Sequence, residues 1–206
     1  MRVDKVILKA FLSTLAAIVI LFAFMFGVLV AAFPSTMMHI SYDFGCDQSS
    51  IRHAKRAYRW FNDTSYMAYA MEVAIGIDDQ EKIEECGTVL VEDEAYFAKY
   101  CDEKYAALDE RVQASMRSTY DQYVYGKIAV AKYKQGKTQD AVNYAFSTLK
   151  GGFPYDNAVA AVLYTALSRD QATVDMVKGK MNELQANEFV EGEKAYFDEM
   201  LALASK

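Results

Sequence analysis

Twenty-four consecutive residues, from Ala10 to Phe33, include no charged side chain. A helix rises about 1.5 Å per residue, so this run is long enough to cross a hydrocarbon core about 30 Å thick. In lipid, every backbone amide must be hydrogen-bonded within the segment, and a helix achieves this. The sequence therefore predicts a transmembrane helix over residues 10–33, preceded by a short N-terminus over residues 1–9.

The charges that flank this run predict its orientation. Arg2, Lys5 and Lys9 precede it with a single acid, Asp4, whereas residues 34–51 contain no Lys or Arg. Positive charge near the ends of a span is retained on the cytoplasmic side. We therefore expect a single-pass signal-anchor with a cytoplasmic N-terminus and an extracytoplasmic C-terminal domain.

A cleaved signal peptide is the main alternative to a retained anchor. Val30-Ala31-Ala32 resembles the small-residue site at which such peptides are cut. The apolar region of a secretory signal usually has only about 7–15 residues, however, and this run is longer. The length favours the retained anchor.

Small residues recur at every fourth position near the end of the predicted span. Ala23, Gly27 and Ala31 would lie on one face of the helix, where small side chains allow two helix backbones to approach closely. This face could mediate self-association or docking to another membrane helix. The simpler interpretation is that Ala and Gly are common in any membrane helix.

After the span, apolar residues recur at helical spacing and predict an all-α domain over residues 47–206. Pro34 is expected to end the membrane helix, and residues 34–46 to form a membrane-proximal linker. Residues 88–125 contain no Gly or Pro and carry one amphipathic stripe, which indicates one long helix or two joined by a tight turn. Further helices are expected over these segments: 47–61, 66–77, 78–86 with Gly87 as a break, 122–134, 140–149, 157–167, 172–184 and 189–204.

The segment from Tyr125 to Pro154 resembles a tetratricopeptide (TPR) repeat, a helix pair of about 34 residues. The matching positions are the first aromatic, the Leu-Gly pair, the glycine of the turn and a small residue of the second helix. In this chain they are Tyr125, Ile128, Ala129, Gly136 and Ala141. Lys132 and Ala145 depart from the family's other aromatic positions. The resemblance implies stacked antiparallel helix pairs that share one core; the alternative is an ordinary helical bundle.

Charge and motif content restrict the function. The residues after Phe33 carry 19 Lys and Arg against 27 Asp and Glu, a net charge of −8, which argues against a nucleic-acid partner. His39 and His53 have no metal-site or triad spacing, and no phosphate-binding loop or nucleophile motif is present. We therefore expect no catalytic, cofactor-binding or metal-binding residues.

Three cysteines, Cys46, Cys86 and Cys101, leave the redox state open. In an extracytoplasmic domain one pair could be bridged, and Cys86 and Cys101 are closer in sequence. Helix-borne cysteines more commonly behave as small buried apolar residues, and we favour that interpretation.

The leading hypothesis is a membrane-anchored scaffold whose helical-repeat domain binds a protein or peptide, as the TPR resemblance implies. Tyrosine buries a large ring and still offers a hydroxyl, so clustered tyrosines are candidates for the partner surface. These candidates are Tyr96, Tyr100, Tyr105, Tyr120, Tyr123 and Tyr133. A second hypothesis is an accessory subunit of a larger membrane complex that docks through its transmembrane helix or forms a homo-oligomer. A third is an enzyme or receptor with an acidic pocket.

Overall fold

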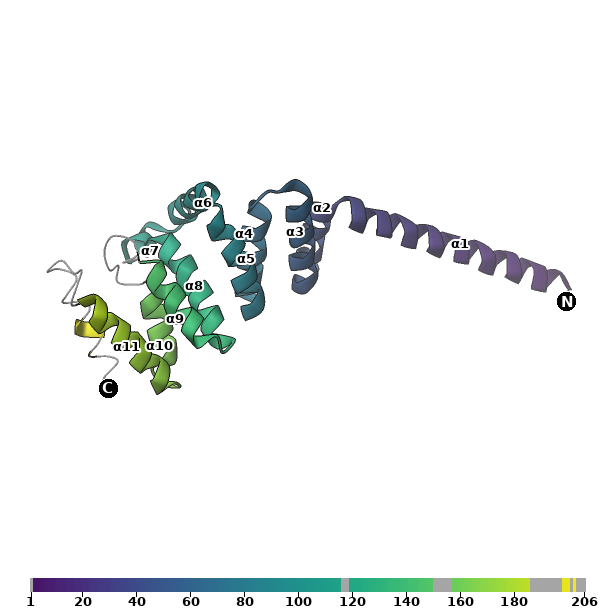
Figure 1. The fold of residues 1–206 in the computed structure, drawn as a ribbon. Coiled ribbons are helices and arrows are strands. Elements are labelled where there is room, and N and C mark those ends of the chain that lie inside the picture. Colours follow the sequence, from purple (N-terminus) through teal and green to yellow (C-terminus); the bar gives the residue numbers. More distant parts are fainter. Residues whose placement is uncertain (1, 116–118, 150–156, 186–197, 201, 203–206) are drawn as a thin grey trace. The chain divides into compact units, whose positions relative to one another are not determined.

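A computed structural model describes residues 2–115, 119–149, 157–185, 198–200 and 202. Every regular element within these residues is a helix, so the chain is all-α as predicted (Figure 1). The chain divides into two compact units, Met1–Asp63 and Thr64–Lys206, which we call unit 1 and unit 2.

Unit 1 begins with one uninterrupted helix, α1 (Arg2–Ala32), drawn in purple in Figure 1. Its segment Val6–Ala32 has 27 residues and is long and apolar enough to cross a membrane, and no part of that segment is buried within the protein. The helix starts before the predicted residue 10, because charged side chains at a helix end do not interrupt the backbone hydrogen bonds. It ends at Ala32, two residues before Pro34, as the proline predicts.

The segment predicted as a membrane-proximal linker over residues 34–46 is largely helical. α2 (Pro34–Asp43) starts directly at the proline, which occupies the first helical turn. Proline is favoured there, because its missing N–H would have no helical partner in that turn and its fixed φ suits a helix. The chain then reverses at Gly45, whose φ of 68° suits glycine, and continues into α3 (Asp47–Phe61).

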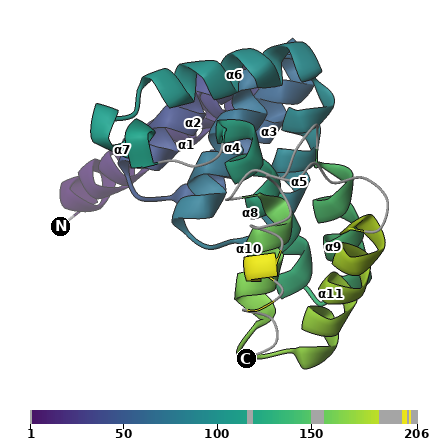
Figure 2. The same cartoon turned by 90° about the vertical axis from the view of Figure 1, so that its left-hand side faces the viewer.

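Unit 2 contains the remaining helices, which are arranged largely as antiparallel neighbours (Figure 2). They are α4 (Ser65–Gly76), α5 (Gln80–Glu92), α6 (Glu94–Ala106), α7 (Glu110–Ser115), α8 (Tyr120–Lys134), α9 (Thr138–Ser147), α10 (Ala158–Ala166) and α11 (Gln171–Gln185). α4 packs on α5, α8 on α9 and α10 on α11. α8 is central, because it also packs against α5, α6 and α10.

The amphipathic stripe over residues 88–125 is divided among four helices rather than one or two. Asp93 separates α5 from α6: its carboxylate accepts the Tyr96 backbone N–H at 3.1 Å and the Thr64 hydroxyl at 2.6 Å. An aspartate that caps a new helix stops the preceding one without Gly or Pro. Gly87, predicted as a break, lies inside α5, where it allows α5 to approach α8 closely.

Other predicted boundaries hold to within a few residues. α8 and α9 are joined by the predicted turn at Gly136, which has a φ of 79°. The caps of α5 and α11 are Asp79 and Asp170, whose carboxylates accept the backbone N–H of Lys82 and of Thr173, each at 3.1 Å. Residues 150–156 lie outside the described residues, as does most of the predicted last helix, 189–204.

The residues that carry the TPR resemblance lie where α8 meets its neighbours. Ile128, Ala129 and Ala141 have no exposed surface, and Tyr125 is 8% exposed. Three further alanines in this region are also fully buried: Ala131, Ala158 and Ala166. Small side chains bring the helix axes close together, so α8 can contact several helices at once.

Candidate functional site

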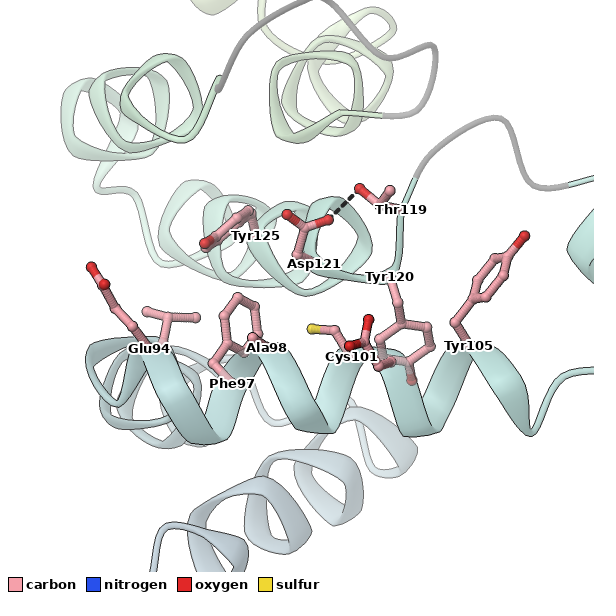
Figure 3. Close-up of a pocket in the computed structure, with 11 residues that line it drawn as sticks. Glu94, Phe97, Ala98, Cys101, Tyr105, Thr119, Tyr120, Asp121 and Tyr125 are labelled. Atoms are coloured by element: carbon pink, nitrogen blue, oxygen red, sulfur yellow. Dashed lines mark hydrogen bonds between the residues drawn. The ribbon is translucent and has the colours of Figure 1, made fainter.

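A cleft of about 590 Å³ lies between α6 and the first half of α8 (Figure 3). We call it the acidic cleft, because the part of its lining that the structure describes, which leaves out residues 116–118, contains three carboxylates and no Lys, Arg or His. Its walls consist of Val91, Glu94, Phe97, Ala98, Cys101, Asp102, Tyr105, Thr119, Tyr120, Asp121 and Tyr125. Aromatic and acidic groups therefore share one concave surface.

The carboxylates come from two helices. Glu94 and Asp102 lie eight residues apart on α6, which places them on one face two turns apart. Asp121 lies in the first turn of α8, where it accepts the hydroxyl hydrogen of Thr119 and the backbone N–H of Gln122 at 2.8 Å (Figure 3). A carboxylate is stabilised at this end of a helix, because the exposed N–H groups carry partial positive charge.

The apolar part of the acidic cleft is formed by packed aromatic side chains and by Cys101. The rings of Phe97 and Tyr125 lie 5.4 Å apart, and both side chains are buried. Burial, followed by the charges of Asp121 and Asp102, raises the pKa of the Cys101 thiol to about 12. Cys101 is therefore a neutral thiol at physiological pH and forms part of the apolar wall rather than a nucleophile.

Four of the six candidate tyrosines form a continuous row across α6 and α8. Tyr96 contacts Tyr100, Tyr100 contacts Tyr120, and Tyr120 contacts Tyr123, with ring centroids separated by 6.3, 6.0 and 5.3 Å. Tyr100 is 7% exposed and belongs to the core, whereas Tyr123 is 38% exposed. The structure thus brings these four side chains together and places the row beside the acidic cleft.

The other two tyrosines lie outside this row. Tyr105 is 39% exposed and lines the acidic cleft. Tyr133 lies near the other end of α8, where its hydroxyl donates to Asp170 at 3.5 Å. Tyr133 therefore does not share a surface with the others.

Tyr100 links the row to α4. Its hydroxyl donates to Glu72 Oε1 at 2.8 Å, and Lys104 Nζ lies 2.5 Å from the same oxygen. Burial and the neighbouring Glu72 carboxylate raise the pKa of Tyr100, so the phenol stays protonated and remains a donor. These contacts hold α6 against α4 and fix one wall of the acidic cleft.

A second concave surface, the α8–α10 groove, has a volume of about 510 Å³. Its lining residues are Gln122, Tyr123, Gly126, Lys127, Val130, Asn157, Ala160, Ala161, Tyr164 and Thr165. A Cβ at Gly126 would lie 3.3 Å from the Ala161 Cβ, so glycine permits the close approach of α8 and α10. Tyr123 and the half-exposed Tyr164 border this groove, whereas Tyr120 borders the acidic cleft. The two surfaces therefore meet at the Tyr120–Tyr123 pair.

The remaining predicted groups lie apart from these surfaces. Ala23, Gly27 and Ala31 are exposed on α1, and nothing lies within 4 Å of the position a Gly27 Cβ would take. All three cysteines are free thiols: Cys86 and Cys101 are buried, as the favoured interpretation predicts, and Cys46 is exposed. Within the described residues, no group of three or more His, Cys, Asp or Glu side chains is placed to hold a metal ion.

Sequence reasoning missed the carboxylates of the acidic cleft. The signal that could have identified the cleft is the spacing of Glu94, Ala98 and Asp102, which keeps the acids in register with the apolar stripe through Phe97 and Cys101.

In comparisons with known proteins, the chain matches no family model, no curated protein sequence and no solved structure.

Proposed function

We propose that the protein is a single-pass membrane-anchored scaffold whose unit 2 binds a protein segment that carries Lys or Arg among apolar residues. The observation that supports this most directly is the acidic cleft, whose described lining residues include three carboxylates and several aromatic rings but no Lys, Arg or His. A basic side chain would pair with the carboxylates, and its apolar neighbours would cover the rings. Complementary charge also raises the rate of encounter.

The charge of unit 2 as a whole agrees with a basic partner. Residues 64–206 carry 15 Lys and Arg against 24 Asp and Glu, a net charge of −9. A field of this sign attracts a basic segment at a distance and repels nucleic acid. Local and overall charge thus favour the same class of partner.

The arrangement of helices supports an extended rather than a point-like contact. α8 packs on α10, the first helix of the next pair, as well as on its own partner α9, which is what stacking of repeated helix pairs requires. The α8–α10 groove then continues the surface beyond the acidic cleft. We therefore interpret unit 2 as a TPR-like stack that holds an extended segment across α6, α8 and α10.

Site-specific photocrosslinking in the protein's own cells tests this interpretation. A photoreactive amino acid at exposed Ala98, inside the acidic cleft, is expected to capture a partner whose crosslinked peptide contains Lys or Arg. The triple variant Glu94→Gln, Asp102→Asn, Asp121→Asn should lower the yield about tenfold, equivalent to about 1.4 kcal/mol of binding free energy. Mass spectrometry of the crosslinked peptide provides the readout.

A matched variant removes the same charge elsewhere in unit 2. Glu81→Gln, Asp140→Asn and Asp175→Asn change exposed residues outside both concave surfaces and should leave the yield unchanged. Equal losses in the two triple variants would show that only overall charge matters and would contradict a specific site. A captured peptide without basic residues would contradict the proposed partner class.

An accessory subunit of a larger membrane complex is the second candidate function, because the Ala23–Gly27–Ala31 face is exposed along α1. Gly27→Leu places a large side chain on this face and should prevent close helix packing in lipid. Retention of the Ala98 crosslink in this variant supports the scaffold. Loss of copurifying membrane subunits, with no crosslink at Ala98 in either protein, supports the accessory subunit.

We further propose that the N-terminus is cytoplasmic and that unit 2 is extracytoplasmic. A membrane-impermeant maleimide added to intact cells, with any outer barrier permeabilised, is expected to label Cys46, because Cys46 is exposed and the other two thiols are buried. The raised pKa of Cys101 suppresses its reaction further. Cys46→Ser should abolish the signal, and labelling that requires membrane lysis would reverse the proposed orientation.

A further inference from the structure

Unit 1 carries charge of the opposite sign to unit 2. α3 bears four Lys and Arg side chains at positions i, i+3, i+4 and i+7, which places them together along one side of the helix. They are Arg52, Lys55, Arg56 and Arg59. A basic stripe of this kind on a helix near a membrane span is typical of contact with anionic lipid.

The other side of α3 is occupied by packing against α2. Ile51, Ala54 and Ala57 have no exposed surface. Ser50 Oγ donates to the Met38 carbonyl oxygen at 2.8 Å, which joins the two helices by a buried hydrogen bond. The orientation of α3 in unit 1 is therefore fixed, and its basic side remains outside the α2–α3 core.

Arg56 connects α3 to the end of the predicted membrane helix. Pro34 has no backbone N–H, so the carbonyl of Val30, four residues earlier, lacks its helical donor. Arg56 Nη1 donates to this oxygen at 3.1 Å. A cation is also favoured at the C-terminal end of a helix by the helix dipole. The basic side of α3 is thus held at the C-terminal end of α1.

A cleft of about 890 Å³ lies where these helices meet, and we call it the basic cleft. One wall of the basic cleft is apolar and consists of Phe26 and Val30 of α1 with Met37 and Ile40 of α2. The other wall belongs to α3, which contributes its four cations, His53 and Trp60. No Asp or Glu is among the described residues that line it. Burial, and then the charges of Arg56 and Arg52, lower the pKa of His53, which agrees with a cationic environment.

We propose that the basic cleft binds the headgroup phosphate of an anionic phospholipid in the leaflet at the C-terminal end of α1. Arg guanidinium groups bind phosphate oxygens in a fixed fork geometry, and Arg52, Arg56 and Arg59 line the cleft together. The acyl chains lie along Phe26 and Val30, which belong to the apolar segment that is long enough to span the membrane.

A membrane lipid fits this cleft better than a soluble anion, because its apolar wall is part of the span. Phe26 lies six residues before the end of α1, about 9 Å into the apolar segment by helical rise. A soluble phosphate would use the basic wall alone and leave this apolar wall without a partner. Trp60, 55% exposed at the edge, belongs to the residue type enriched at membrane interfaces.

Trp60 is the single tryptophan of the chain, so its fluorescence reports on this cleft alone. Full-length protein is reconstituted in nanodiscs of phosphatidylcholine with a minor fraction of phosphatidylglycerol, and bromine is placed on the acyl chains of one lipid at a time. At equal mole fraction, brominated phosphatidylglycerol is expected to quench the fluorescence of Trp60 more strongly than brominated phosphatidylcholine does. The preference for phosphatidylglycerol should fall by up to roughly 100-fold, about fivefold for each cation, in the triple variant Arg52→Gln, Lys55→Gln, Arg59→Gln.

Arg56 is left unchanged in this variant because it also satisfies the Val30 carbonyl. The matched control, Lys99→Gln, Arg111→Gln and Arg169→Gln, removes three exposed cations from unit 2 and should keep the preference. Equal quenching by both lipids, or a preference that survives the α3 substitutions, would overturn the proposed site. Loss of the preference on addition of inorganic phosphate would identify a soluble anion as the ligand instead.

The lipid site shares with the proposed scaffold only the placement of α1 in a membrane. Coelution of every variant with the nanodiscs reports on that placement separately. Coelution without a phosphatidylglycerol preference therefore rejects the lipid site and leaves the anchor standing, whereas failure to coelute rejects both.

Discussion

Gly87→Leu is expected to destabilise unit 2 by about 3 kcal/mol, because the position has no room for a side chain. A Cβ at Gly87 would lie 2.7 Å from Ile128 Cγ1 and 3.2 Å from Met71 Sδ. Ile128 is fully buried and Met71 is 1% exposed, so neither can move away without disturbing other contacts of α8 and α4. Thermal unfolding of the detergent-solubilised protein, followed by circular dichroism, should show a midpoint lowered by roughly 6–12 °C.

The matched control places the same side chain at Gly179, inside α11. Nothing lies within 4 Å of a Cβ there, and the position is exposed. Leu forms helix better than Gly by about 0.8 kcal/mol, so Gly179→Leu should be neutral or slightly stabilising. An unfolding midpoint for Gly87→Leu that matches this control would show that α5 and α8 can move apart at little cost.

Gly87 also shows where sequence reasoning about helices stops. The periodicity of apolar residues predicted the all-α class and most helices of unit 2, because local spacing dictates which side of a helix is buried. When only the local sequence is considered, a glycine inside such a pattern predicts a break in the helix. Whether it is a break or a close approach depends on a helix some forty residues later in the chain, and no local pattern contains that information.

Local spacing and long-range contact also differ in what they predict about the acidic cleft and the basic cleft. The tyrosine row could be predicted in part, because Tyr96, Tyr100, Tyr120 and Tyr123 follow helical spacing on segments with strong periodicity. The basic cleft could not be predicted, because residues 34–51, which follow the span directly, contain no Lys or Arg and the cations of the cleft come only later, from α3. The α2–α3 turn then returns the cations of α3 to the end of α1, so charges remote in sequence become neighbours in space.

Glu84→Gln is expected to destabilise unit 2 by about 2 kcal/mol at neutral pH, because Glu84 joins α5 to the turn between α8 and α9. Its two carboxylate oxygens accept hydrogen bonds from Lys132 at 2.8 Å, Gln135 at 2.7 Å and Lys137 at 2.6 Å. The Glu84 side chain is only 15% exposed, and that of Lys132 only 18%. Loss of the carboxylate therefore leaves a largely buried ammonium without its counter-charge.

The effect of Glu84→Gln should depend on pH in a direction that the pKa of Glu84 determines. Burial is the largest single influence on this pKa and raises it. The hydrogen bonds from Lys132, Lys137 and Gln135 and the charge of Lys132 together lower it by a larger amount, so the pKa of Glu84 lies below its ordinary value of 4.5. A carboxyl group with a depressed pKa in the folded state stabilises the protein fully above its unfolded-state pKa. The stabilisation is lost as the pH falls through the folded-state value.

The free-energy difference between the wild-type protein and Glu84→Gln should therefore be constant above about pH 5.5 and shrink below about pH 4.5. Taking this difference cancels the contributions of Asp78, Asp93 and Asp170, whose pKa values are also lowered. Glu81→Gln serves as the control, because Glu81 is 76% exposed and its ion pair with Lys82 should contribute less than about 1 kcal/mol. A difference for Glu84→Gln that stays constant to acidic pH would mean that the charge of Glu84 contributes nothing. Shape and hydrogen bonding would then hold α5 against the α8–α9 turn by themselves.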